Sequence, residues 1–171
     1  MRSKKIRDMI LFSMFGALMF CSKLIMEFLP NIHLLGMFTM LLTVTYRRRA
    51  LIPIYIYVIL NGLYSGFNLW WVPYTYIWTI LWGATMLLPR KMSDKTASVV
   101  YPIVCCLHGL LYGTLYAPCQ ALMFGLNFRQ MLVWIGAGFY FDLIHAISNF
   151  AMGFLVLPLS KLLLKLEKGY N

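Results

Sequence analysis

Charged residues are scarce in this chain of 171 amino acids. Only 12% of the residues are charged and five are acidic, whereas 61% are hydrophobic and the mean hydropathy is +0.75. A soluble domain usually carries about a quarter charged residues. At about 20 residues per bilayer crossing, the chain has room for about six spans. The composition therefore indicates an integral membrane protein and leaves no room for a catalytic head, an ATPase module or a receptor domain.

Two motifs that would supply energy or hold a metal are missing. The sequence has no Gly-x-x-x-x-Gly-Lys-Ser/Thr phosphate loop, so the chain cannot hydrolyse ATP alone. Cys105 and Cys106 precede His108, but no second ligand pair follows at zinc spacing. All four cysteines lie in apolar runs and are expected to pack as small hydrophobic residues. We expect no metal, no cofactor and no enzymatic activity, and energy must come from a partner.

The positions of the cations that give the net charge of +10 indicate the membrane topology. Nucleic-acid binding would need cations clustered on one surface, but they occur in short groups between apolar runs. Four lie near the N-terminus, three follow the second run, three follow the fourth run, and three lie near the C-terminus. Of the remaining two, Arg129 falls on the opposite side and Lys23 lies within the first run. This pattern predicts an all-α bundle of six transmembrane helices in the cell membrane with both termini cytoplasmic, over residues 9–28, 32–46, 50–66, 69–88, 99–124 and 131–164.

Polar residues share one face of the last run. Asp142, His145 and Asn149 are spaced i, i+3 and i+7, so they project from the same side of a helix. A carboxylate at mid-bilayer costs a few kcal/mol unless it is paired or faces water. This face must therefore point into the bundle. It forms either a ligand pocket or a polar knot that holds helices together.

Aromatic residues are dense at the outer end of the fourth run, which opens at Asn68. Trp71, Tyr74 and Trp78 share a face, and Trp78 lies about two turns deep. An aromatic belt at the lipid headgroups explains the shallow rings more easily than Trp78. Aromatic walls with a few fixed polar groups are typical of a pocket for a flat organic ligand. Both interpretations stay open.

Two further sets point to the same half of the membrane. In the fifth run, His108 and Tyr112 are spaced i, i+4, and Gln120 lies further toward the outside. At the outer end of the first run, Lys23 and Glu27 form either a pocket ion pair or side chains that snorkel to the interface.

Small residues recur at every fourth position in two runs. Such stripes let helices approach closely in lipid, so one stripe is expected to serve internal packing and the other to dock a membrane subunit. The stripes are Ser13, Ala17 and Cys21 in the first run, and Gly109, Gly113 and Ala117 in the fifth.

Over nearly its whole length, the chain resembles the substrate-binding S components of energy-coupling factor (ECF) vitamin transporters. The resemblance rests on six helices, the basic N-terminus before a small-residue stripe, and the segment Gly-Phe-Tyr-Phe-Asp-Leu-Ile-His-Ala-Ile-Ser-Asn at residues 138–149. In that family, an Ala-x-x-x-Ala stripe of the first helix contacts a membrane-embedded coupling subunit. Ser13, Ala17 and Cys21 occupy the corresponding positions here and keep only the small size.

The resemblance implies a function that composition alone does not supply. An S component captures its substrate outside, joins a coupling subunit and two cytoplasmic ATPases, and topples in the membrane to release the ligand. We expect a planar aromatic or heterocyclic ligand, neutral or cationic unless Arg129 and Lys23 face the pocket. The alternatives are a ligand-free scaffold subunit, or an intramembrane enzyme with Asp142 and His145 as an acid-base pair. The expected substrate-binding residues are Asn68, Trp71, Tyr74, Trp78, His108, Tyr112, Gln120, Asp142, His145 and Asn149.

Overall fold

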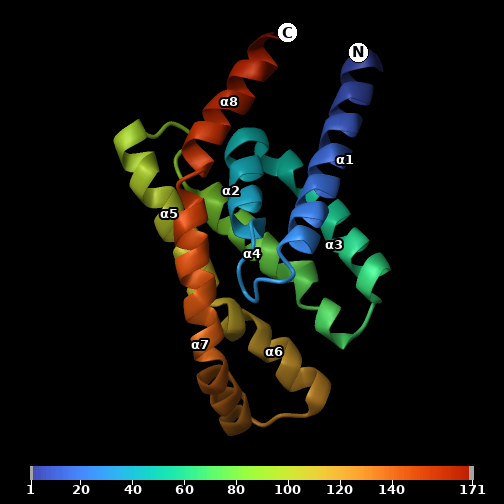
Figure 1. Cartoon of the computed structure of the whole chain (residues 1–171), viewed down its shortest axis with the longest axis vertical. Helices are drawn as coiled ribbons and strands as arrows, with labels where there is room; N and C mark the ends of the chain where they lie inside the picture. The colour runs from blue at the N-terminus through green and yellow to red at the C-terminus, as the bar shows by residue number, and fades with distance from the viewer. Residues whose placement is uncertain (1, 170–171) are drawn as a thin grey trace.

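The computed structural model describes residues 2–169, and this part of the chain is helical without any strand (Figure 1). The all-α class predicted from the sequence is thereby confirmed. The α-helices are α1 (Arg2–Ile25), α2 (Leu35–Tyr46), α3 (Leu51–Ser65), α4 (Tyr74–Leu87), α5 (Asp94–Leu110), α6 (Tyr112–Phe124), α7 (Phe128–Gly153) and α8 (Val156–Gly169), and the short 3-10 helices are η1 (Arg47–Ala50) and η2 (Leu69–Trp71).

The eight α-helices form six nearly continuous helical segments, one for each predicted run. The fifth run is broken at Leu111 into α5 and α6, and the sixth is broken after Gly153 into α7 and α8. Residues 4–25, 94–124 and 128–153 are long and apolar enough to cross a membrane. Helices α2, α3 and α4 have 12, 15 and 14 residues. At about 1.5 Å per residue, each is shorter than the hydrocarbon core of about 30 Å.

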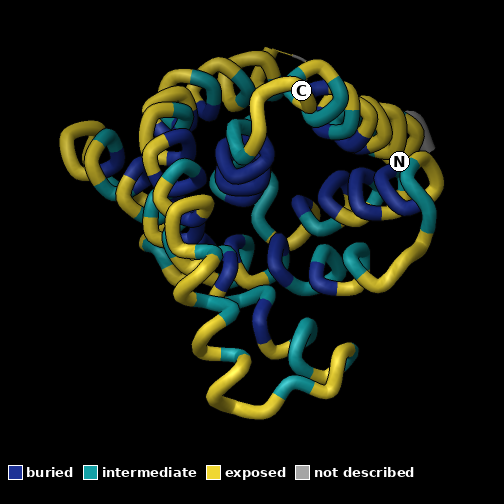
Figure 2. The backbone as a smooth tube through the Cα atoms, turned by 60° about the horizontal axis from the view of Figure 1, so that its bottom comes forward, coloured by how far each residue is buried: buried dark blue, intermediate teal, exposed yellow. Residues whose placement is uncertain are grey.

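Helix α2 is the centre of the bundle. Its sequence is apolar on all sides, and every residue from Leu35 to Thr43 is buried. It packs against α4 and α8 most extensively, and also against α5 and α7. Figure 2 shows its buried turns enclosed by helices whose outer faces are exposed. A helix without a polar face is stable only when other apolar elements surround it.

The outer surface of the bundle is rich in large apolar side chains. Met9 of α1, Leu87 of α4 and Leu122 of α6 are 70%, 87% and 86% exposed. Soluble monomers rarely expose contiguous apolar patches of more than a few hundred Å². The three long apolar helices and this surface are compatible with membrane insertion.

Ion pairs join the charged segments at one end of the bundle, where both termini lie (Figure 1). Arg49 of η1 contacts Asp8 of α1 at 3.1 Å, and Arg7 contacts Glu167 of α8 at 3.7 Å. Lys161 of α8 also pairs with an acidic residue at the start of α5. The segments that carry the clustered cations therefore meet in space, as their predicted location on one side requires.

Helices α5 and α7 make the most extensive contact in the molecule, and glycine permits it. A Cβ atom on Gly109 would lie 2.7 Å from the carbonyl oxygen of His145, and one on Gly153 would lie 2.6 Å from Cα of Pro102. The stripe of Gly109, Gly113 and Ala117 thus serves internal packing. By contrast, the stripe on α1 is exposed at all three positions, because α1 packs on α3 through its opposite face.

Substitution Gly109→Ala is expected to lower the free energy of unfolding by about 1–3 kcal/mol, because the added methyl meets the α7 backbone. Gly83→Ala is the matched control, since no heavy atom lies within 4 Å of its Cβ position. That change is expected to stabilise α4 by about 0.5–1 kcal/mol. Thermal unfolding in detergent measures both, and equal melting temperatures for the two variants would contradict the packing.

Candidate ligand-binding cavity

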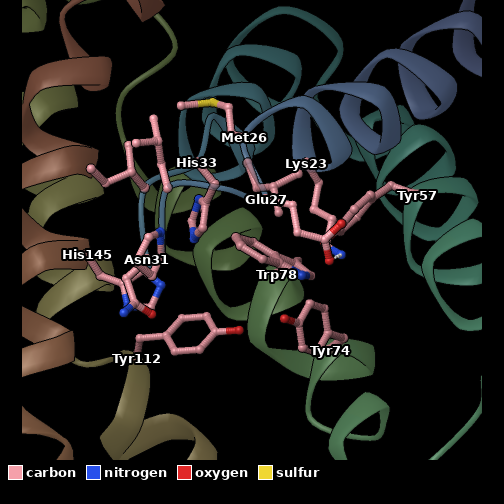
Figure 3. Close-up of a pocket in the computed structure, with 14 residues that line it drawn as sticks. Lys23, Met26, Glu27, Asn31, His33, Tyr57, Tyr74, Trp78, Tyr112 and His145 are labelled. Atoms are coloured by element: carbon pink, nitrogen blue, oxygen red, sulfur yellow. Dashed lines mark hydrogen bonds and ion pairs between the residues drawn. The ribbon is translucent and has the colours of Figure 1, made fainter. Parts of the chain in front are cut away.

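A cavity of about 240 Å³ lies beneath the connection between α1 and α2, at the far end of α1 from the N-terminus (Figures 1 and 3). Its walls come from α1, α3, α4, α6 and α7 together with the connection itself. The labelled side chains in Figure 3 surround a common space rather than one surface groove. Residues far apart in the sequence therefore build one site.

The connection over residues 26–34 folds back because its sequence ends the helix. Pro30 cannot continue the hydrogen-bonding pattern of α1, and Asn31 adopts a left-handed conformation with φ of 63°. Backbone hydrogen bonds from Leu29 to Met26 (2.9 Å) and from Ile32 to Leu29 (3.1 Å) close successive turns. The connection thereby places side chains such as Asn31 over the cavity.

Trp78 is the centre of the aromatic wall, with only 1% of its surface exposed. Its ring centroid lies 6.1 Å from that of Tyr57, and 6.2 Å from those of Tyr74 and Tyr112. The imidazole of His33 meets it edge-on at 5.8 Å. Rings from α3, α4, α6 and the connection thus converge, and the wall they form suits a flat aromatic ligand.

Three polar atoms in this wall are buried without a hydrogen bond to any described residue: the hydroxyl of Tyr57, Nε1 of Trp78 and Nδ1 of His33. Leaving a buried donor unsatisfied costs about 1–3 kcal/mol. Most buried polar groups in proteins have a partner, so three exceptions in one wall require a reason. A ligand with hydrogen-bonding groups at its edges supplies one.

Lys23 and Glu27 line the cavity as an ion pair, with Nζ of Lys23 3.1 Å from Oε1 of Glu27. Of the two sequence interpretations, the structure favours the pocket pair. Because the two charges are opposite and adjacent, they leave this side of the cavity electrically neutral overall.

A second cavity, of about 350 Å³, lies between α6 and α7. It shares Asn31, Tyr112 and His145 with the first cavity, and it also reaches Gln120 and Asp142. The rings of Tyr112 and His145 stack with centroids 4.7 Å apart and an interplanar angle of 27°. This stacked pair is therefore a common wall of both cavities.

Asp142 also holds the bundle together. Its Oδ1 accepts a hydrogen bond of 2.8 Å from the backbone N–H of Gly113, at the break between α5 and α6. The first N–H groups of a helix have no partner within it, so the carboxylate caps α6 from the neighbouring helix. The sequence left two interpretations for the face that carries Asp142: a ligand pocket, or a polar contact that holds helices together. Both apply to Asp142, because it links two helices and also lines a cavity.

The predicted site residues divide between the cavities and the packing around them. Those that line one or both cavities are Tyr74, Trp78, Tyr112, Gln120, Asp142 and His145. Those that line neither are Asn68, Trp71, His108 and Asn149.

Each of these four has a structural environment of its own. Trp71 donates from Nε1 to the carbonyl of Val58 (2.8 Å), and Asn68 is exposed beside it. The Nε2 of His108 donates to the Ile77 carbonyl at 3.1 Å. Asn149 is buried where α7 meets α2.

Sequence reasoning missed Asn31, His33 and Tyr57 as cavity residues. One signal was present for His33: the chain has three histidines, and the other two stood on predicted pocket faces. Its position next to the start of a predicted span concealed it. Tyr57 carried no signal, because it is one of three tyrosines in its apolar run and nothing in the sequence distinguishes it from Tyr55 and Tyr64.

No family model, no curated protein and no solved structure matches this chain. Within residues 2–169, no cluster of three or more His, Cys, Asp or Glu side chains is placed to hold a metal ion. The side chains around the two cavities offer aromatic surface, hydrogen-bonding groups and charge.

Tyr57→Phe and Tyr76→Phe are expected to change stability in opposite directions. The hydroxyl of Tyr57 has no partner among the described residues, so its loss raises the unfolding free energy of the ligand-free chain by about 1 kcal/mol. The hydroxyl of Tyr76 donates to the Leu115 carbonyl at 2.8 Å, so its loss lowers that free energy by about 1 kcal/mol. Thermal unfolding after exhaustive dialysis measures both, and equal destabilisation would show that Tyr57 is satisfied within the protein.

Proposed function

We propose that the chain is the substrate-specificity subunit of an ECF-type uptake transporter. It captures a small, planar, vitamin-like compound from outside, and a coupling subunit with two cytoplasmic ATPases drives its delivery to the cytoplasm. The observation that supports this proposal is the aromatic cavity in which Tyr57 and Trp78 keep buried polar atoms without partners among the described residues. A ligand-free scaffold subunit has no need of such a cavity.

The proposed orientation follows from the distribution of charge. The cation-rich end, with both termini, faces the cytoplasm of a cell-membrane protein, and the six helical segments cross or enter the bilayer. The connection over the cavity then faces outward, because α1 runs from the charged end toward it. In this orientation the cavity is open to ligand capture from outside.

The exposed stripe on α1 is the proposed docking face for the coupling subunit. Ala17 and Cys21 line a shallow apolar groove with Met14 and Leu18, and Ser13 is exposed on the same helix. Small side chains let a second helix approach the backbone closely. This contact and the ligand cavity use different parts of α1, so both can be occupied together.

Mass spectrometry of compounds released by denaturing the purified chain tests the ligand site. We expect one planar aromatic compound, and His33→Ala is expected to lower its yield about tenfold, which corresponds to about 1.4 kcal/mol of binding free energy. Asn68→Ala is the control, since Asn68 is exposed and lies outside both cavities. An empty protein that purifies without ATPases would favour the scaffold function instead.

Ala17→Leu is expected to abolish co-purification of the coupling subunit and ATPases, because the larger side chain keeps the partner helix away. Ala137→Leu on α7 adds the same bulk at another exposed position and is expected to have no effect. Pull-down of the tagged chain from its native membrane measures both variants. Loss of the complex in both, or in neither, would rule out α1 as the docking face.

A further inference from the structure

We propose that the ligand carries a cationic nitrogen and that the second cavity, at Asp142, binds it. The inference rests on the proposed function and adds the charge class of the substrate. Its flat part lies among the rings of the first cavity, and its charged part lies between α6 and α7.

Four of the five carboxylates are paired with cations. They are Asp8 with Arg49, Glu27 with Lys23, Asp94 with Lys161, and Glu167 with Arg7. Asp142 is in none of the ion pairs found within residues 2–169, although it is only 4% exposed. It is thus the buried acidic side chain for which the described residues supply no cation.

The hydrogen bond from α6 compensates only part of the negative charge of the Asp142 carboxylate. The Gly113 N–H at the helix N-terminus occupies one of about four acceptor positions of the carboxylate. A helix N-terminus corresponds to about half an elementary charge, so about half the charge remains unbalanced. In an apolar helix such as α7, a remaining negative charge is costly, and a cation in the cavity lowers that cost.

The other walls of the second cavity also favour a cation. Gln120 has an amide oxygen that can accept a hydrogen bond, and the aromatic rings of Tyr116 and Trp134, which attract cations, also line the cavity. Those two rings stack with centroids 5.9 Å apart, which fixes their orientation. Arg129 does not line either cavity, and Lys23 is neutralised by its partner.

The two cavities are neighbours, because they share three residues. Asn31, Tyr112 and His145 border each of them, so a ligand that occupies both needs only a short substituent to extend past this shared wall. The predicted ligand class is therefore a planar aromatic ring with an amine on a short side chain, or with a second, cationic ring.

Matched probes that differ in one charged group test this class. The chain is reconstituted in nanodiscs and titrated with tryptamine against tryptophol, and with pyridoxamine against pyridoxine. We expect each amine to bind about tenfold more tightly than its alcohol, as measured by calorimetry and by the shift in melting temperature. Asp142→Asn is expected to remove this preference while keeping an oxygen that can accept from Gly113. Asp8→Asn, at the opposite end, is expected to keep the preference.

Gln120→Lys provides a second variant if Asp142→Asn fails to fold, since a built-in cation beside Asp142 is also expected to remove the preference. Equal or tighter binding of the alcohols by the wild-type chain overturns the inference, as does a preference that survives both substitutions. If the compound released from the native chain is uncharged or anionic, the charge class is wrong and the proposed transport function stands. If neither probes nor released compound bind the folded chain, both proposals fail.

Discussion

The hydrogen bond between Asp142 and the N–H of Gly113 is the interaction on which the site depends. Gly109 lets α5 approach the α7 backbone, and the break at Leu111 then leaves Gly113 with a free N–H that only a neighbouring helix can satisfy. Because Asp142 satisfies it, α6 can leave the line of α5 without an unsatisfied end (Figure 1). Because α6 turns away from the line of α5, the second cavity lies between α6 and α7, and Tyr112 lies in the wall that this cavity shares with the first.

In the proposed membrane location, lipid as the solvent explains why close packing and an open cavity occur in the same small bundle. Between helices in a membrane, apolar burial gives little drive to associate, so small residues and interhelical hydrogen bonds supply the contact. These features concentrate along α5, α7 and the buried α2, which form a firm scaffold. The scaffold can then support Tyr57 and Trp78 with unsatisfied polar atoms at its far end, because their cost of a few kcal/mol is offset elsewhere.

Local patterns in the sequence predicted the features that depend on local physics. Runs of apolar residues gave the six helical segments, and helical spacing identified Tyr74, Trp78, Tyr112 and His145 as cavity residues. Helical periodicity gave wrong cavity residues where the helix, or its contact with the cavity, did not extend as far as the sequence pattern did. Trp71 lies in η2, before α4 begins at Tyr74, so the helical spacing that links it to Trp78 does not apply. Asn149 lies on the same face of α7 as His145, one turn further along the helix. At that level the face contacts α2 and no longer borders the cavity.

The division of charge along the bundle also bears on how a ligand leaves. The ion-paired end carries a surplus of cations, whereas the cavities contain one neutralised pair and the unpaired Asp142. Under the proposed transport function, a cationic ligand at Asp142 is attracted to its site and repelled by the end that it would have to reach. Passage through the bundle is also opposed by the buried residues of α2, which fill its centre. Release under that proposal therefore requires reorientation of the subunit or work by a partner, in keeping with a sequence that has no phosphate-binding loop.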